Sequence, residues 1–407
     1  MSTELNKMQI DLIDKIAKEN GFMEYQVTTN KGSEKGDNFL GILTLITLDN
    51  GENKLELILK SAQQKDTFRK VAPIRRAYLR EIYLYENVFV VFKKYQDDHN
   101  IADTFDCYAK IYESSTVEEN ECLILENLKV KGYQLWNRKI YMNTEHISAV
   151  LKEYGKFHAI SMAMRHKNVE LYEKLTEDIK VGIWLEKDET WDARVKYIKS
   201  VMVVGHEAVK DSTDLKEFLK KVEDSLPDLI HKELRTPEYQ QALVHGDCWC
   251  NNIMFKYENE LDKTKPSSLR IVDWQISSEN SPAFDFCYFF LIHSTKEVLD
   301  DYQSYMKLYY ESFSQHLKSF DCDPNEVFPY ARFEKHVNRY MLYGMFISFV
   351  IMRIMICDSD EAPDFSQLAE GEAFLDSLHF KIKNTNLLNE RLRTVIVFIK
   401  EHNFFTY

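Results

Sequence analysis

The chain has 407 residues, of which 44% are hydrophobic and 29% charged, and this balance excludes a chain that is disordered over most of its length. The 65 acidic residues outnumber the 52 lysines and arginines and give a formal net charge of −13, which argues against a nucleic-acid-binding protein, because such surfaces carry an excess of cations. The seven cysteines are an odd number in a long chain, so we expect reduced, buried thiols in a cytoplasmic protein rather than a disulfide framework.

Membrane and export signals are not evident in the sequence. The first seven residues do not combine a basic segment with an apolar one, so we expect no secretory signal. The most apolar segment runs from Tyr340 to Met352 between two arginines. It is shorter than the roughly 20 residues that span a bilayer. We therefore expect a buried helix there and no membrane span.

The N-terminal part begins with a helix and continues with strands. Residues 5–19 repeat apolar side chains at helical spacing, and residues 22–29 are short and mixed in character. Two strands are predicted at 39–48 and 55–60, joined by a hairpin at Asp49-Asn50-Gly51, because Asn-Gly adopts the positive φ that such turns need.

The strand at 55–60 alternates, so Leu57 and Leu59 face one side while Ile58 and Lys60 face the other. Pro73 suits the first position of a helix, and Glu81 lies on the apolar stripe of that helix. Two more strands are predicted at 105–113 and 122–126, which makes this a strand-rich region with one central helix.

From Asn143 onward helices dominate. The predicted amphipathic segments are 191–205, 213–231, 283–318, 327–357 and 383–402. Residues 243–272 are the exception, with short apolar runs separated by polar loops. The composition changes near residue 127, so we place a domain boundary there.

The most informative segment is His245-Gly-Asp-Cys-Trp-Cys-Asn-Asn252, followed by Asp273 in Ile271-Val-Asp-Trp-Gln275. Asn252 and Asp273 offer the oxygen ligands that Mg²⁺ prefers, and Asp247 is then left to accept or orient a hydroxyl proton. Protein kinases use this Asp, Asn, Asp arrangement for phosphoryl transfer. Asp273 alone would read as a solvated loop carboxylate, so the prediction depends on the whole set.

These motifs, together with Ser281-Pro-Ala-Phe-Asp285, resemble the ecdysteroid kinase-like family, which comprises small-molecule kinases related to aminoglycoside phosphotransferases and choline kinases. Lys35-Gly-Asp-Asn38, Lys60 and Arg80-Glu81-Ile-Tyr-Leu-Tyr85 also match. The resemblance extends over about residues 20 to 390. It implies an α+β, protein-kinase-like two-lobe fold. The expected N-lobe, residues 1–126, is a small antiparallel sheet with a key helix, and the expected C-lobe, residues 127–407, is larger and helical.

Within that resemblance Lys60, at the end of a strand, would reach the phosphates of ATP, and Glu81 would hold it by an ion pair. An exposed strand lysine and a half-buried helix acid are the alternatives for these two residues. Gly32, Ser33 and Gly36 lie between predicted strands and would cover the phosphates with backbone amides, although taken alone they form an ordinary polar hairpin.

Other family positions would support the site. Backbone groups near Glu126 and Leu128 would bind adenine at the hinge, unless this is simply a buried strand. His245 and Asp285 would support the residues of the site rather than act on the substrates themselves, and Asp285 would brace the catalytic loop through backbone amides. The alternative for Asp285 is a helix N-terminal acid stabilised by the dipole.

Three further residues attract attention for other reasons. His158 is expected to be a hydrogen-bonded core histidine. Cys248 and Cys250 invite a zinc interpretation near His245, but their spacing does not match structural zinc sites, so buried thiols are favoured.

We therefore expect a kinase that uses ATP and Mg²⁺ to phosphorylate an alcohol on a small molecule, with an ecdysteroid or another lipophilic alcohol as the leading acceptor. One alternative is a choline- or aminoglycoside-type kinase with a cationic polar acceptor. The other is a nucleotide-binding pseudokinase that acts as a scaffold.

Overall fold

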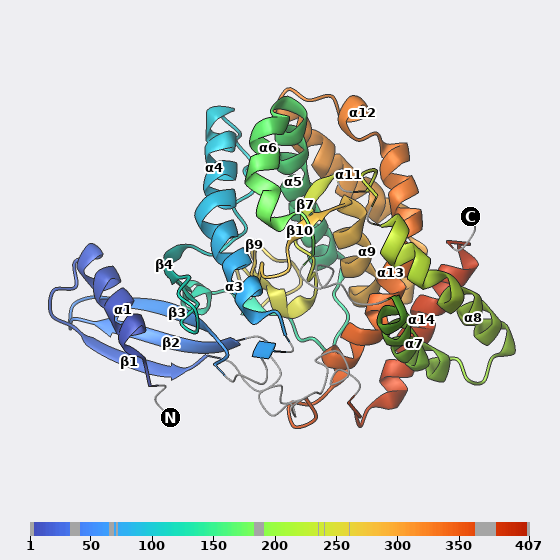
Figure 1. Cartoon of the computed structure of the whole chain (residues 1–407), viewed down its shortest axis with the longest axis horizontal. Coiled ribbons are helices and arrows are strands. Elements are labelled where there is room, and N and C mark those ends of the chain that lie inside the picture. Colours follow the sequence, from blue (N-terminus) through green and yellow to red (C-terminus); the bar gives the residue numbers. More distant parts are fainter. Residues whose placement is uncertain are drawn as a thin grey trace.

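The computed structural model describes residues 4–32, 41–64, 69–70, 72–182, 191–234, 236–239, 241–259, 261–362 and 380–404. Within these ranges the protein is α+β, as predicted. An antiparallel sheet lies at one end of the molecule and most of the helices at the other (Figure 1).

The main sheet has five antiparallel strands in the order β1-β2-β3-β5-β4. Their bounds are Gln26–Lys31 (β1), Gly41–Asp49 (β2), Lys54–Ala62 (β3), Ile111–Ser115 (β4) and Cys122–Glu126 (β5). The predicted hairpin joins β2 to β3, and Gly51 has a φ of +86° in its turn. The segment that looked mixed in the sequence contains β1, which pairs with β2 along its whole length.

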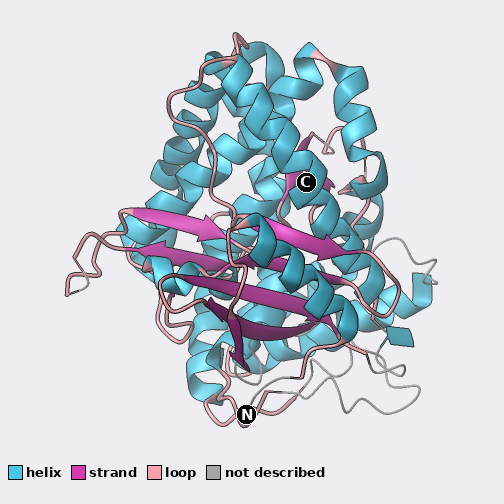
Figure 2. Ribbon diagram, turned by 90° about the vertical axis from the view of Figure 1, so that its left-hand side faces the viewer, coloured by secondary structure: helices cyan, strands magenta, loops and turns pink. Residues whose placement is uncertain are grey.

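Helix α1 (Lys7–Glu19) packs on one face of this sheet, and Figure 2 views the molecule from the end where the sheet lies. Ile13 and Ile16 bury their side chains against Leu57 and Leu59 of β3. The alternation along β3 is therefore as predicted, because Ile58 and Lys60 face away from α1.

A longer helical segment than predicted follows Pro73. Helix α3 (Ile74–Tyr83) continues through a π-helical turn, η1 (Leu84–Val88), into α4 (Phe89–Asp98). Leu84, Val88 and Phe92 are buried along it. The predicted central helix is therefore present and longer than expected, because burial of this apolar stripe continues along α4.

The strand predicted at 105–113 forms only at its end, as β4. Phe105 and Cys107 are buried alternately, which is the pattern of a strand. Their backbone groups pair elsewhere, however, since the Phe105 amide donates to the Gln96 side chain and the Cys107 carbonyl accepts from the amide of Ile271. Alternating burial thus arises here without a continuous strand ladder.

The rest of the chain is mostly helical. Its helices of eight or more residues are α5 (Thr144–Lys167), α6 (Val169–Thr176), α7 (Trp191–Ala208), α8 (Thr213–Asp228), α9 (Pro282–His293), α11 (Tyr302–Ser319), α13 (Tyr330–Ile356) and α14 (Thr385–Glu401). The shorter α10 (Lys296–Asp300) and α12 (Pro324–Val327) connect them. These helices lie close to the predicted segments.

Short strands occupy the predicted exception between 243 and 272. They are β7 (Ala242–Val244), β8 (Ile253–Lys256) and β9 (Ser268–Ile271), while β6 (Gln134–Leu135) and β10 (Ser278–Asn280) lie outside this range and pair with β8 and β7, respectively. One small sheet has the order β6-β8-β9, and the other pairs β10 with β7. The loops after β7 and β9 carry the residues singled out in the sequence.

Helix α13 is long and apolar enough to cross a membrane, being 27 residues in length, but 67% of its apolar window is buried inside the protein. It packs against α9 and is a core helix, as predicted for Tyr340 to Met352. All seven cysteines are free and buried, which agrees with the expectation of reduced thiols.

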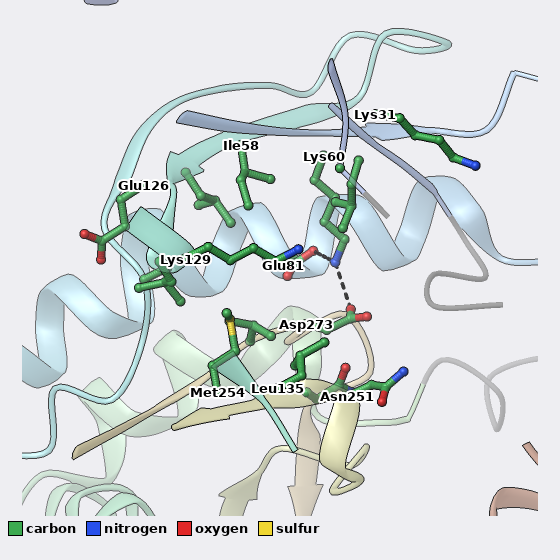
Figure 3. Close-up of a pocket in the computed structure, with 17 residues that line it drawn as sticks. Lys31, Ile58, Lys60, Glu81, Glu126, Lys129, Leu135, Asn251, Met254 and Asp273 are labelled. Atoms are coloured by element: carbon green, nitrogen blue, oxygen red, sulfur yellow. Dashed lines mark hydrogen bonds and ion pairs between the residues drawn. The ribbon is translucent and has the colours of Figure 1, made fainter. Parts of the chain in front are cut away.

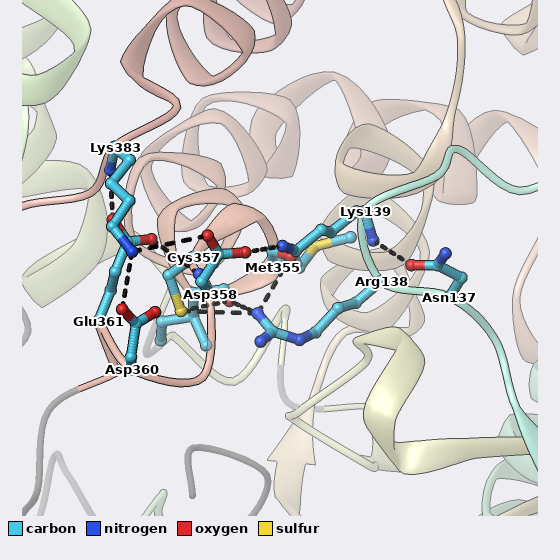
Figure 4. Close-up of polar contacts among 10 residues, drawn as sticks. Asn137, Arg138, Lys139, Met355, Cys357, Asp358, Asp360, Glu361 and Lys383 are labelled. Atoms are coloured by element: carbon cyan, nitrogen blue, oxygen red, sulfur yellow. Dashed lines mark hydrogen bonds and ion pairs between the residues drawn. The ribbon is translucent and has the colours of Figure 1, made fainter.

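The end of α13 is tied to the segment that follows the main sheet (Figure 4). Arg138 donates to the carbonyls of Ile354 and Met355, which lie among the last residues of the helix. Lys139 pairs with Asp358 just beyond it. A cation at a helix C-terminus is favourable because the last carbonyls carry partial negative charge.

Candidate active site

A cavity of about 540 Å³ lies between the main sheet and the loops after β7 and β9 (Figure 3). Its polar or charged lining residues, with one glycine, are Lys31, Gly32, Lys60, Glu81, Glu126, Lys129, Asn251, Asn252 and Asp273. Its apolar lining residues are Leu43, Ile58, Ala109, Leu125, Leu128, Leu135, Met254 and Val272. Ile58 and Met254 lie on opposite sides, so the cavity offers apolar walls to a flat ring.

Lys60 lies in the cavity wall because β3 turns its side chain away from α1. Its ammonium is 2.7 Å from Glu81 Oε2 and 2.8 Å from Asp273 Oδ1, and the residue is only 5% exposed. Burial by itself would lower the pKa of Lys60, but the charges of Asp273 and Glu81 outweigh it and raise the pKa above its ordinary value. The lysine is therefore a fixed cation beside the cavity.

Glu81 is fully buried on α3, where the apolar stripe of the helix packs beneath the sheet. Besides Lys60, it accepts a hydrogen bond of 3.2 Å from the backbone amide of Trp274. The ion pair predicted from the sequence is thus present, and Glu81 also contacts the loop that carries Asp273.

The neighbouring Arg80 ties α3 to the other half of the molecule. Its guanidinium donates to the carbonyl oxygens of Ser277 and Val181, each at 2.9 Å. Charge-assisted hydrogen bonds of this kind are stronger than neutral ones. Two adjacent residues of α3 therefore have separate tasks: Glu81 fixes Lys60, and Arg80 fixes the loop after β9.

The loop from His245 to Asn252 follows β7 and depends on a glycine. Gly246 has a φ of +89°, and a Cβ there would come within 2.9 Å of the Ile276 carbonyl oxygen. His245 accepts from the Asp247 amide at Nδ1, so Nε2 donates to the Val272 carbonyl at 3.0 Å. Burial lowers the pKa of His245, which is consistent with this neutral form.

Three side chains hydrogen-bond Asp247, namely those of Asn252, Tyr288 and Trp249. Its Oδ2 accepts from Asn252 Nδ2 at 2.8 Å, and its Oδ1 accepts from Tyr288 Oη at 2.8 Å. Burial and, secondly, the charge of Asp273 raise the pKa of Asp247 to about 6, although the hydrogen bonds from all three side chains oppose the rise. Asp247 does not line the cavity itself but contacts Asn252, which does.

Asp273 is the second residue after β9 and adopts a strained backbone. Its φ is +63°, a region that non-glycine residues rarely occupy. Such strain persists only where the surroundings fix it and is common at functional sites. The amide of Val272 donates to the Asn252 carbonyl at 2.9 Å, so the two loops are joined immediately before Asp273.

Asp285 supports the His245 loop from α9. It accepts from the backbone amides of His245 and Gly246 at 2.7 and 3.0 Å. These are the contacts predicted from the family pattern. Burial alone would raise the pKa of Asp285, but the hydrogen bond from His158 and the nearby amides hold it below its usual value. His158 is fully buried and hydrogen-bonds Asp285 and Tyr309, as expected of a core histidine.

Two oxygen atoms in this arrangement suit a hard cation. Asn252 uses its amide nitrogen for Asp247, and Asp273 uses Oδ1 for Lys60. Asn252 Oδ1 and Asp273 Oδ2 form no hydrogen bond to the described residues, and these are the donor types that Mg²⁺ prefers. In the described part of the chain no group of three or more His, Cys, Asp or Glu residues could hold a metal ion.

The structure gathers most of the predicted site residues but adds others. Gly32, Glu126 and Leu128 line the cavity, whereas Ser33 and Gly36 lie outside the described residues. Asn251, Lys129 and Tyr288 were missed. The spacing of Tyr288 three residues after Asp285 on a helix could have indicated that both face the same loop.

Comparison with known sequences decides the family. A sequence model of the ecdysteroid kinase-like family matches residues 35–322, which is more than half of the chain. This chain belongs to that family. The resemblance seen in the sequence is thereby confirmed, and the matched range contains Lys60, Glu81, the His245–Asn252 loop and Asp273.

Other comparisons add little to this assignment. A comparison with curated proteins gave no significant match. Among solved structures, spectinomycin phosphotransferase in complex with ADP and spectinomycin is 9% identical and matches with a TM-score of 0.38. The match covers 90% of this chain and 93% of the other. Neither fold nor chemistry follows from a likeness at that TM-score.

Proposed function

We propose that this member of the ecdysteroid kinase-like family is an ATP-dependent kinase that phosphorylates a hydroxyl group of a small molecule. The observation that carries the proposal is Lys60, a buried cation held between Glu81 and Asp273 at the wall of an apolar-sided cavity. A cation fixed beside a cavity with apolar walls suits the phosphates and the flat ring of a nucleoside triphosphate.

The proposed fold is protein-kinase-like, with residues 1–126 as the N-lobe and 127–407 as the C-lobe. In support, the cavity is lined both by the main sheet and α3 and by the loops after β7 and β9. Backbone groups near Glu126 and Leu128 would bind the adenine. The seven free, buried cysteines favour a reducing, cytoplasmic location for such an enzyme.

Each charged residue receives a role in this proposal. Lys60 binds the α- and β-phosphates, and Asn252 and Asp273 would hold Mg²⁺. When bound, the metal would neutralise phosphate charge. The acceptor hydroxyl gives its proton to Asp247 while its oxygen forms a bond to the γ-phosphorus and the bond to the ADP oxygen breaks. A pKa of about 6 leaves Asp247 mostly ionised at neutral pH, the form that accepts a proton.

We infer that the acceptor is a lipophilic alcohol, with an ecdysteroid as the leading candidate. Aromatic side chains from three helices form a cluster that includes Tyr343, which is close enough to Asp247 to be influenced by its charge. Phe284 of α9 lies 4.6 Å from Tyr343 of α13 between ring centroids, and Tyr197 of α7 lies 6.2 Å from Phe346. Burial raises the pKa of Tyr343, with smaller contributions from Tyr197 and Asp247. A partly buried aromatic surface beside the proposed base favours an apolar acceptor over choline or an amino sugar.

Asp247→Asn tests the proposal. We expect the variant to bind Mg-ATP like the parent but to lose roughly 10²–10⁴-fold in turnover, because the general base is removed. ATP consumption would be screened over a library of steroid, lipophilic and cationic alcohols, with Mg-ATP binding followed by thermal shift. The exposed Asp98 provides a matched control, and Asp98→Asn should behave like the parent.

Three outcomes separate the candidates. Unchanged turnover in Asp247→Asn would refute the assigned base. Binding of Mg-ATP by the parent without turnover of any alcohol would favour the pseudokinase. Phosphorylation of choline or aminoglycosides, with steroids inert, would refute the lipophilic acceptor.

A further inference from the structure

Tyr288 touches the proposed base but has no part in the function described above. Its hydroxyl donates to Asp247 Oδ1 at 2.8 Å, and its side chain is almost fully buried, with 2% exposure. Asn252 donates to the other carboxylate oxygen at the same distance. The carboxylate is therefore held at both ends, by groups from two different elements.

Helix α9 presents Tyr288 to this loop with little freedom. The helix begins with Ser281 as its N-cap and Pro282 in its first turn, and nearly all of its residues are buried. Asp285, one turn before Tyr288, accepts from the amides of His245 and Gly246. Residues three apart on a helix lie on the same face, so α9 fixes both the backbone of the loop and the carboxylate that the loop carries.

The hydroxyl of Tyr288 acts as a donor here. Burial and the nearby Asp247 charge raise the pKa of Tyr288 well above its ordinary value, so its proton stays on the phenol. The Trp249 side chain is a third hydrogen-bond donor to Asp247, so three of the four lone pairs of the carboxylate are engaged and one remains for an incoming hydroxyl. Rotation of the carboxylate about its terminal bond would break these hydrogen bonds.

We propose that Tyr288 is a positioning residue, which holds the Asp247 carboxylate in the orientation that receives the acceptor's proton. This inference rests on the proposed function, because it needs Asp247 to be the base. The contact predicts an effect on turnover and none on nucleotide binding, since Tyr288 does not line the cavity. A misplaced catalytic group costs rate without necessarily costing affinity.

Tyr288→Phe removes the hydrogen bond and keeps the ring. We expect kcat to fall about tenfold to a hundredfold, while the Kd for Mg-ATP and the melting temperature stay near those of the parent. The reaction measured is phosphorylation of the alcohol found in the screen or, where none is found, slow hydrolysis of Mg-ATP by water. Tyr310→Phe is the matched control, because Tyr310 also donates one hydrogen bond of 2.8 Å, to the Phe328 carbonyl.

A double-mutant cycle adds a second readout. Once Asp247 is Asn, adding Tyr288→Phe should cost little further rate, because groups that act as one unit are not additive. An additive loss would overturn the inference, and so would a kcat within twofold of the parent in the single variant. If kcat, Mg-ATP affinity and melting temperature all fall together, Tyr288 is structural and the inference is wrong. A parent protein that neither binds nor consumes Mg-ATP would overturn the proposed function, and this inference with it.

Discussion

Lys60 and Glu81 illustrate how two residues 21 positions apart become one unit. Both are buried, so removing one of them would leave the charge of the other desolvated and without its partner. We expect Lys60→Ala and Glu81→Ala each to lower kcat/KM by about 10²-fold or more, since each removes a placed charge from the site. The double variant should lose little more than the worse single one.

A double-mutant cycle on kcat/KM measures this coupling, which we expect to be about 1–3 kcal/mol. Lys93 and Asp97 form an exposed pair on α4 and supply the control, for which the coupling should be below about 0.5 kcal/mol. Additive losses for Lys60 and Glu81 would contradict the view that they act as a pair.

Asn252 and Asp273 differ in charge, and this difference predicts their order of importance. A carboxylate is a stronger ligand for Mg²⁺ than a neutral amide. Asp273→Ala should therefore weaken Mg²⁺-dependent ATP binding by about tenfold or more, which corresponds to ~1.4 kcal/mol, and Asn252→Ala should weaken it less.

Titration calorimetry with Mg-ATP, and with ATP in the presence of EDTA, checks this prediction. The loss should be confined to the titration that contains Mg²⁺. Equal affinities of both variants and the parent for Mg-ATP would place the metal site elsewhere.

At the scale of elements, the site depends on how closely α5 and α11 pack. A Cβ at Gly155 of α5 would lie 2.9 Å from the Tyr309 carbonyl oxygen and 3.0 Å from the Phe313 amide nitrogen. These are backbone atoms of α11, so they cannot rotate away. Gly155→Ala should therefore destabilise the fold by about 1–3 kcal/mol, despite the better helix propensity of alanine.

Urea unfolding of Gly155→Ala measures this effect. Lys152→Ala, on the exposed side of the same helix, should change the free energy of unfolding by less than about 0.5 kcal/mol. Separation of the helices would also disturb His158, which hydrogen-bonds both Tyr309 and Asp285. A stable Gly155→Ala protein would show that the helices can move apart at little cost.

At the scale of the whole molecule, buried histidines should make stability depend on pH. Burial lowers the pKa to about 3 in His293 and to about 4 in His146, His316 and His336. In the unfolded chain a histidine has a pKa near 6.5. Below about pH 6.5 the unfolded state therefore binds protons that the folded state does not, and stability falls as the pH falls towards 4.

When the pH falls from 7.5 to 5.5, each such histidine should lower the free energy of unfolding by about 1 kcal/mol. Urea midpoints at the two pH values measure the total. His316→Leu should reduce the difference by the contribution of one histidine, because Nε2 of His316 is buried without a hydrogen-bond partner among the described residues. The exposed His166→Gln is the control and should leave it unchanged. Equal stability at both pH values would contradict the prediction.

Local patterns in the sequence determined much of this protein. Alternation in β3 placed Lys60 opposite the face that packs on α1, and the Asp-Asn spacing of the loop after β7 marked Asp247 and Asn252. The hairpin at Gly51 followed from the need for a positive φ. Such signals are visible in the sequence because they depend on neighbours within a few residues of one another.

Only the tertiary structure decided which distant groups meet. The extension of α3 into α4 follows from burial against the rest of the molecule. The backbone of residues 105–110 bonds to Gln96, to Ile271 of β9 and to Glu126 of β5 without forming a continuous strand. Tyr288 reaches Asp247 from 41 residues away, and Arg80 reaches Ser277 from 197. Propensity and periodicity carry no information about such contacts, because they arise when separate elements pack and desolvate one another.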